Sequence, residues 1–103
     1  MKTQRMRKMD LKYETGRIYM TDDHGAVVAE VTFPAVSADV VNIDHTFVHD
    51  SLRGQGVAAQ LMKAAADRLR GEGRRAYPTC SYAVRWFEKN PDYADVYTES
   101  PEL

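Results

Sequence analysis

The sequence predicts an α/β fold of the α+β type: one mixed, mostly antiparallel sheet with two main helices packed on it. The first half of the chain contains three runs rich in β-branched and aromatic residues, with turn signals between them. A run with helical spacing follows, and then a short apolar run and a second helical run. With no internal repeat and no linker, this order favours one sheet covered by helices.

The first two runs form a predicted β-hairpin. Residues 16–22 alternate weakly between polar and apolar side chains, whereas residues 26–35 are strongly β-branched and aromatic. Between them, residues 22–25 read Asp-Asp-His-Gly, which is a turn signal. We therefore expect two antiparallel strands joined by a short turn.

A third strand is predicted at residues 40–49, after Pro34 and a short polar segment. A period of two residues places one set of side chains on one face and the alternate set on the other. The two sets are Val41, Ile43, His45 and Phe47, and Asn42, Asp44, Thr46 and Val48. This mixture of apolar and polar residues predicts a half-buried member of an antiparallel sheet.

The spacing of apolar residues changes to a helical period at Val57. The residues that recur at four-residue steps are Val57, Leu61, Ala65 and Leu69. They predict an amphipathic helix over residues 56–70, and Gly71 and Gly73 permit a left-handed cap that ends it.

The last third of the chain predicts one more strand and one more helix. Residues 74–80 form a short strand that Pro78 ends, and residues 81–90 form a helix stopped by Asn90 and Pro91. The tail, residues 92–103, has the composition for one short last strand.

Composition bounds the class of protein. Residues 1–103 are expected to form a single domain, with 1–10 as a frayed terminus, because a chain of this length buries roughly 65% of its unfolded surface. The formal net charge is −1, so no overall field attracts nucleic acid or an anionic membrane. No window approaches the roughly 20 apolar residues of a membrane span. These features favour a soluble, cytoplasmic protein, either a monomer or a weak homodimer.

Cysteine and histidine usage predicts no metal. Cys80 is the only cysteine, which excludes an intramolecular disulfide and a multi-cysteine metal site. The three histidines, His24, His45 and His49, are too scattered to form a helical pair of metal ligands.

The loop before the first helix is a candidate anion site. A helix begins with about four N–H groups that have no partner in the helix, and their partial positive charge attracts anions. Gly54 and Gly56 lie where those donors are expected, and Arg53 adds a cation. A short glycine pattern alone is weak evidence, since glycine also serves a turn.

The segment Arg53-Gly54-Gln55-Gly56-Val57-Ala58 resembles the Arg/Gln-x-x-Gly-x-Gly/Ala signature of the GCN5-related N-acetyltransferases. The resemblance covers residues 17–97. The resemblance is more specific to a minimal, single-domain branch of this family, which carries a His-Thr pair and a Pro-x-Cys-Ser-Tyr segment. In this chain these are His45-Thr46 and Pro78-Thr79-Cys80-Ser81-Tyr82.

The resemblance implies an acetyl-coenzyme A site. It implies that the backbone amides of residues 53–58 cradle the pyrophosphate, and that Phe47 and Val48 pair through their backbone with the pantetheine arm. On the second helix, Cys80, Ala83 and Phe87 stand where the wider family has Asn, Ala and Tyr. The family's Tyr protonates the departing thiolate of coenzyme A, which Phe87 cannot do.

Cys80 is a candidate nucleophile. A thiol at a helix N-terminus has its thiolate favoured by unpaired N–H groups. Beside the acetyl group, Cys80 would accept it by transthioesterification and pass it on. The alternative is a lone cysteine that fills space at a helix start.

His45 is a candidate general base for an amine or for Cys80, since an ordinary imidazole titrates near pH 6.5. A histidine on an apolar strand face is also often a hydrogen-bonded core residue. Tyr82 and Tyr93 are possible acids in place of Phe87, although packing against Trp86 is the alternative for both.

Three functions follow from these residues. The first is acetyl-coenzyme A-dependent transfer of acetyl to an unknown amine or thiol acceptor, with Cys80 and His45 as catalytic residues. The second is a coenzyme A or acyl-coenzyme A binding module or sensor without turnover. The third is a small interaction domain whose basic N-terminus contacts nucleic acid, which would show strongly salt-dependent binding.

Overall fold

The computed structural model describes residues 10–101, so the expectation of a frayed terminus falls almost wholly outside the described residues. It contains the strands β1 (Lys12–Glu14), β2 (Arg17–Thr21), β3 (Val27–Thr32), β4 (Val40–Ile43), β5 (His45–Val48) and β6 (Arg75–Pro78). The helices are α1 (Val57–Glu72) and α2 (Ser81–Lys89), and two 3-10 turns are η2 (Asp50–Leu52) and η3 (Pro91–Tyr93). The predicted fold class, a mostly antiparallel mixed sheet with two helices, is confirmed.

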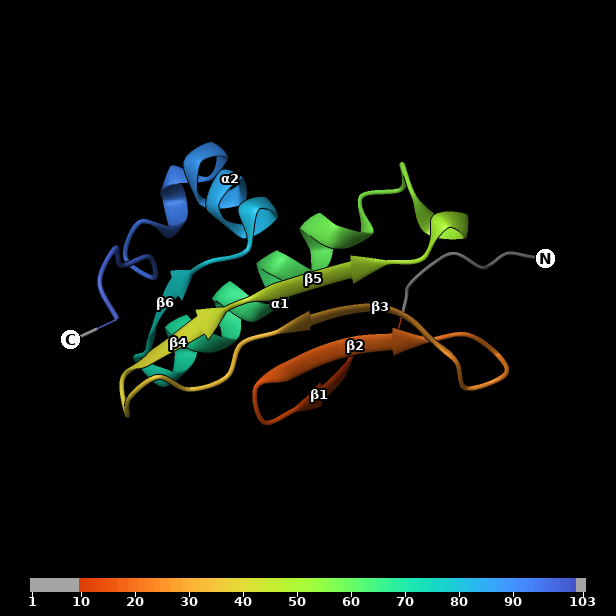
Figure 1. Ribbon diagram of the computed structural model, residues 1–103, viewed down its shortest axis with the longest axis horizontal. Coiled ribbons are helices and arrows are strands. Elements are labelled where there is room, and N and C mark those ends of the chain that lie inside the picture. The colour runs from red at the N-terminus through yellow and green to blue at the C-terminus, as the bar shows by residue number, and fades with distance from the viewer. Residues whose placement is uncertain (1–9, 102–103) are drawn as a thin grey trace.

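The strands form two ladders that share one continuous segment. β1, β2, β3 and β5 pair in that order as antiparallel neighbours, whereas β4 pairs with β6 in parallel. In Figure 1, β4 and β5 follow each other along one line, with α1 behind the sheet and α2 on the side of β6. Residues 40–48 therefore change partner halfway along their length.

Helix α1 covers one face of the sheet and supplies much of the core. Its buried side chains are Val57, Leu61, Met62, Ala65, Ala66 and Leu69, which belong to one core with Ile18, Ala29 and Val31 of the sheet. The helix ends at Gly73, which adopts φ 70° and donates its N–H to the carbonyls of Arg70 and Leu69. It therefore runs two residues beyond the predicted end.

The structure adds an edge strand that the sequence did not predict. β1 pairs with β2 across a turn at Thr15 and Gly16, where Gly16 adopts φ 71°. Its carbonyl accepts the N–H of Phe33 at 2.8 Å. Residue 16 was expected to begin the first strand, but its positive φ makes it part of the turn instead.

The prediction that residues 40–48 keep one alternation was wrong. Val41 and Ile43 are buried, yet His45 and Phe47 are exposed. Asp44 donates its N–H to the carbonyl of Thr32, and His45 pairs with that same Thr32. Two residues oppose one, which is a β-bulge, and a bulge shifts every following side chain to the other face.

The C-terminal tail forms one bridge where a short strand was expected. Ala76 donates its N–H to the carbonyl of Val96 at 2.7 Å and accepts the N–H of Thr98 at 2.9 Å. Within residues 10–101, no helix combines the length and the apolar character that a membrane crossing requires.

Candidate functional site

The free edge of β5 is where the predicted site residues converge. The carbonyl of Ile43, at the end of β4, accepts the N–H groups of both Thr79 and Cys80 at 3.1 Å. Beyond that point β5 pairs with β3 on one side, and α2 begins on the other with Cys80 as its N-cap residue. The change of partner at Asp44 thus leaves one edge of β5 open.

The register of the β3–β5 ladder decides which backbone groups face that edge. His49 donates its N–H to the carbonyl of Val28 at 2.7 Å, and Glu30 is opposite Phe47. Because antiparallel residues alternate in hydrogen-bonding direction, Thr46 and Val48 turn their backbone groups outward, whereas Phe47 bonds to β3. The expectation for Val48 stays a prediction. Because the backbone of Phe47 bonds to β3, only its ring can contact a ligand, and that ring lies on the exposed face of the sheet.

The glycine loop has the geometry of both a turn and a cradle. Gly54 and Gly56 adopt φ 81° and 75°, a region that side chains rarely occupy, and a Cβ at either would meet nothing within 4 Å. Gly56 is the N-cap of α1, and no side chain caps it. The first N–H groups of α1 therefore face open space, as an anion site requires.

Two side chains of this loop bond within it. Arg53 pairs with Asp50 at 3.0 Å and remains largely exposed. The amide of Gln55 donates to the carbonyl of Ser51 at 3.2 Å. Arg53 therefore lies beside the helix start, whereas Gln55 folds back on the preceding turn.

A pocket of about 430 Å³ opens over the loop. It is lined by Val48, Leu52, Arg53, Gly54, Gly56, Val57, Ala58, Ala59 and Tyr82. Six of the predicted cofactor residues are thus brought together, whereas Phe47, Gln55, Cys80 and Phe87 are not among the lining residues.

Tyr82, for which the sequence left open a role as an acid or in packing, lines this pocket and also packs against the core. Burial raises the pKa of its phenol, which keeps the hydroxyl protonated. Trp86, the expected partner, instead contacts Phe87 and Tyr93, with ring centroids 5.2 and 5.1 Å away. The signal that could have found Tyr82 is its position two residues after the helix N-cap, next to the predicted nucleophile.

The side chain of Cys80 is half-buried, with hydrogen-bond donors near its sulfur. Its Sγ lies 3.5 Å from the hydroxyl of Thr46. Burial raises the pKa of the thiol, but the Thr46 hydroxyl and the backbone N–H groups of Ala83, Tyr82 and Thr46 outweigh it, so the net pKa is lowered. The arrangement favours a thiolate, the form in which cysteine acts as a nucleophile.

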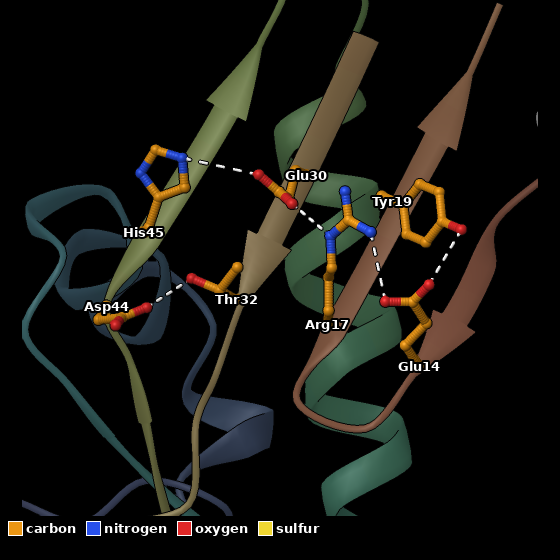
Figure 2. Close-up of polar contacts among 7 residues, drawn as sticks. All are labelled: Glu14, Arg17, Tyr19, Glu30, Thr32, Asp44 and His45. Atoms are coloured by element: carbon orange, nitrogen blue, oxygen red, sulfur yellow. Dashed lines mark hydrogen bonds and ion pairs between the residues drawn. The ribbon is translucent and has the colours of Figure 1, made fainter. Parts of the chain in front are cut away.

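His45 projects from the other face of β5. Its side chain is 55% exposed, and Nε2 lies 3.9 Å from Oε1 of Glu30, as Figure 2 shows. Neighbouring residues of a strand point to opposite faces, so Thr46, and not His45, contacts the thiol. The predicted pair of Cys80 and His45 therefore flanks one strand from two sides.

Phe87 and Tyr93 lie away from the glycine loop. Phe87 is buried on α2 between Trp86 and Tyr97 and lines a separate pocket beside η3. The hydroxyl of Tyr93 donates to Asp67 of α1 at 2.6 Å. Neither supplies an acid at the thiol. Across residues 10–101, no three His, Cys, Asp or Glu side chains come together in a way that could hold a metal ion.

The sequence matches the profile of the GCN5-related N-acetyl-transferases over residues 17–96. Protein NATD1 of Bos taurus is 38% identical over 63 residues, which make up 61% of this chain and 56% of that protein. Protein NATD1 of Danio rerio is 30% identical over 82 residues, or 80% of this chain and 73% of that protein. The chain therefore spans little more than half the length of the cattle relative.

Solved structures agree with these sequence matches. The NMR structure of a GCN5-like protein of Staphylococcus aureus superposes with a TM-score of 0.75 at 36% identity. The match covers 90% of this chain and 91% of that protein. The ribosomal-protein-S18-alanine N-acetyltransferase of Escherichia coli superposes with a TM-score of 0.57 at 18% identity, over 71% of this chain and 49% of its own. The second match shows a shared fold.

Proposed function

This chain belongs to the GCN5-related N-acetyltransferases, and on that premise we propose that it transfers acetyl from acetyl-coenzyme A to an amine acceptor by way of Cys80. One observation carries the proposal. Tyr82 lines the pocket over the glycine loop, and Cys80, two residues before it, presents its thiol at the adjoining edge of β5. An anion site and a favoured thiolate therefore lie at the two ends of one open strand edge.

The residues of the loop fit a pyrophosphate. Gly54 and Gly56 leave room above the backbone, the uncapped N–H groups of α1 face it, and Arg53 adds a positive charge. The outward backbone groups of Val48 and the outward carbonyl of Thr46 suit an extended arm with amide groups, because these can complete the hydrogen bonds of a strand edge. The substrate supplies the thioester whose acetyl group is transferred.

Cys80 would perform the first step. Its thiolate attacks the thioester carbonyl carbon, a carbon–sulfur bond forms at Sγ, and the bond to the coenzyme sulfur breaks, which releases that sulfur as a thiolate. In the second step an amine nitrogen attacks the acetyl-cysteine carbonyl. A carbon–nitrogen bond forms, the Cys80 thiolate leaves, and the amine gives up one proton.

Binding is tested first by thermal unfolding with coenzyme A. A ligand at about 100 times its Kd stabilises the folded state by about 2.7 kcal/mol, which shifts the melting temperature by several degrees. The double variant G54A/G56A should lose most of this shift, whereas G25A, in the β2–β3 turn, should keep it. No shift of the wild type at millimolar ligand would remove the proposal.

Transfer is tested by mass spectrometry. Incubation with acetyl-coenzyme A should add one acetyl group to Cys80, and later addition of an amine should remove it. Cys80→Ser should show no labile adduct at this position while keeping the thermal shift. A wild-type protein that binds coenzyme A but never gains the adduct would rule out the cysteine route.

A second function, an acyl-coenzyme A binding module or sensor, is favoured by Phe87. This residue is buried and has no ionisable group to protonate a departing thiolate. A sensor would form an acetyl-Cys80 adduct that persists when amines are added. The persistence of the adduct therefore separates the two functions.

We further propose that the chain acts in the cytoplasm as a monomer or a weak homodimer. A nucleophilic thiol must stay reduced to work, and the cytoplasm keeps thiols reduced. Analytical ultracentrifugation over a range of concentrations measures the oligomeric state, and fractionation measures the compartment.

A further inference from the structure

The face of the sheet opposite α1 carries a network of charged side chains. Cross-strand pairing places Arg17 of β2, Glu30 of β3 and His45 of β5 on this face. Figure 2 shows the carboxylate of Glu30 between the other two, contacting Nε of Arg17 with one oxygen and facing Nε2 of His45 at 3.9 Å with the other. One carboxylate therefore faces a nitrogen from each of the two neighbouring strands.

Arg17 is fixed in place by further contacts. Its Nη1 lies 3.3 Å from the carboxylate of Glu14, and its guanidinium stacks over the ring of Tyr19 at 3.9 Å from the centroid. The hydroxyl of Tyr19 donates to Glu14 in turn, at 3.2 Å. Because Arg17 is held on two sides, it also holds Glu30, whose side chain is only 20% exposed.

The carboxylate of Asp44, the other acid near His45, is already engaged. It accepts a hydrogen bond from the hydroxyl of Thr32, the residue opposite His45 in the ladder. Glu30 is therefore the carboxylate that faces the imidazole in the network of Figure 2.

His45 and Cys80 flank the same short piece of strand. Cys80 donates its N–H to the carbonyl of Ile43 and places its Sγ beside the hydroxyl of Thr46. These two partners lie on either side of His45 in the sequence. A group at a strand edge can be approached from either face of the sheet. For His45 to act in the transfer, the acceptor must lie on the Glu30 face and meet the thiol at this edge.

We propose that Glu30 is a positioning residue that holds His45 as the base for the amine acceptor. The inference rests on the proposed function. In neutral imidazole one nitrogen carries the proton and the other accepts one, and a facing carboxylate favours the proton on the nitrogen turned toward it. Glu30 thus keeps the proton on Nε2 and leaves the Nδ1 lone pair free for the acceptor.

The acceptor nitrogen forms its bond to the acetyl carbon of acetyl-Cys80, and the bond from that carbon to Sγ breaks. Nδ1 of His45 takes the proton that the nitrogen loses, and the imidazolium rests against Glu30 until the proton passes to solvent. Alkylamines need such a base, since they are largely protonated near neutral pH.

The test uses the variant Glu30→Gln and measures two half-reactions separately, the acetylation of Cys80 and its discharge to an amine. The matched control is Glu14→Gln, which removes a second carboxylate from Arg17 but does not touch His45. Acetylation of Cys80 by acetyl-coenzyme A should match the wild type in both variants. Discharge to ethylamine should fall on the order of 10- to 100-fold in E30Q and stay within about twofold in E14Q, because a positioned base contributes that much or more.

Hydroxylamine gives a second probe, because it is mostly unprotonated near neutral pH and needs no base. Its discharge rate should be the same in E30Q and the wild type. Equal losses with both amines, equal losses in E14Q and E30Q, or a wild-type ethylamine rate in E30Q would each overturn the inference.

The ring itself gives a readout that does not depend on transfer. Nitrogen-15 NMR at about pH 8.5, where an ordinary imidazole is neutral, should show the proton on Nε2 of His45 in the wild type and E14Q. E30Q should lose that preference, and an unchanged spectrum would overturn the role of Glu30. If wild-type Cys80 gains no acetyl group, the proposed function fails, and the spectrum alone decides whether Glu30 positions His45.

Discussion

The hydroxyl of Thr46 lies 3.5 Å from the sulfur of Cys80, although 34 positions separate them in the sequence. The contact crosses the open edge of β5 and joins the strand to the start of α2. Burial raises the pKa of the thiol, but this hydroxyl and the backbone N–H groups of Ala83, Tyr82 and Thr46 outweigh it, so the net pKa is lowered. A side chain and the backbone of the strand edge thus prepare the group that the proposed transfer needs.

Thr46→Val should make Cys80 less reactive at neutral pH. Burial still raises the pKa of the thiol, and one of the opposing hydrogen bonds is gone, so the pKa moves upward. The rate of alkylation by iodoacetamide as a function of pH should have its midpoint below that of an ordinary thiol in the wild type, and at higher pH in the variant.

Thr21→Val is the matched control, on β2 away from the thiol. Its profile should coincide with that of the wild type. A profile for T46V that does not move would mean that the Thr46 hydroxyl leaves the thiol unaffected.

Gly56→Ala and Gly25→Ala should cost similar stability but differ in ligand binding. Both glycines have positive φ and open space around the missing Cβ, so alanine meets only backbone strain, of about 1–2 kcal/mol. G56A also places a methyl group over the loop that is proposed to hold pyrophosphate. Urea unfolding measures the first effect, and calorimetric titration with coenzyme A the second. Equal affinities in the two variants would speak against the loop as the binding site.

Tyr82→Phe should weaken coenzyme A binding by roughly twofold to tenfold, the value of one hydrogen bond of about 0.5–1.5 kcal/mol. Tyr82 lines the pocket over the loop, and burial raises the pKa of its phenol, which keeps the hydroxyl protonated as a donor. Tyr97→Phe, beside Phe87 on the far side of α2, should bind as the wild type does. A loss of affinity in Y97F equal to that in Y82F would point to a general effect of packing.

Tyr93→Phe should destabilise the protein more at neutral pH than in acid. The Tyr93 hydroxyl, followed by Lys63, lowers the pKa of the Asp67 carboxyl in the folded state. A carboxyl with a lowered pKa stabilises the fold above its unfolded value of about 3.9 and loses that contribution as pH falls through the folded value. The difference in free energy of unfolding between Y93F and the wild type should therefore shrink from pH 7 to about pH 3. A difference that is constant over this range would contradict the role of Asp67.

Local patterns were sufficient to predict the helices and the glycine loop. The apolar residues of α1 recur at helical spacing, and Gly54 and Gly56 directly precede the helix. Both features depend on neighbours in the sequence and not on how the sheet is paired. Cys80 at the N-cap of α2 was predicted for the same reason, since Pro78 and the run after it mark the junction.

Features that depend on distant partners were not predicted. The bulge at Asp44 exists because the segment leaves β6 for β3 at that point, and neither partner is visible in the local pattern. Consequently His45 was assigned to an apolar face. Glu30 was not singled out in the sequence, because only the pairing of β2, β3 and β5 brings Arg17 and His45 to it.

An open strand edge exposes a protein to unwanted pairing with other chains, and its length sets the hazard. β5 has four residues, and its register turns the backbone of only Thr46 and Val48 outward. That is too short a template for a stable added strand, yet it matches the one extended arm of the proposed ligand. The bulge at Asp44 thus also protects solubility, because it keeps the opening in the sheet small.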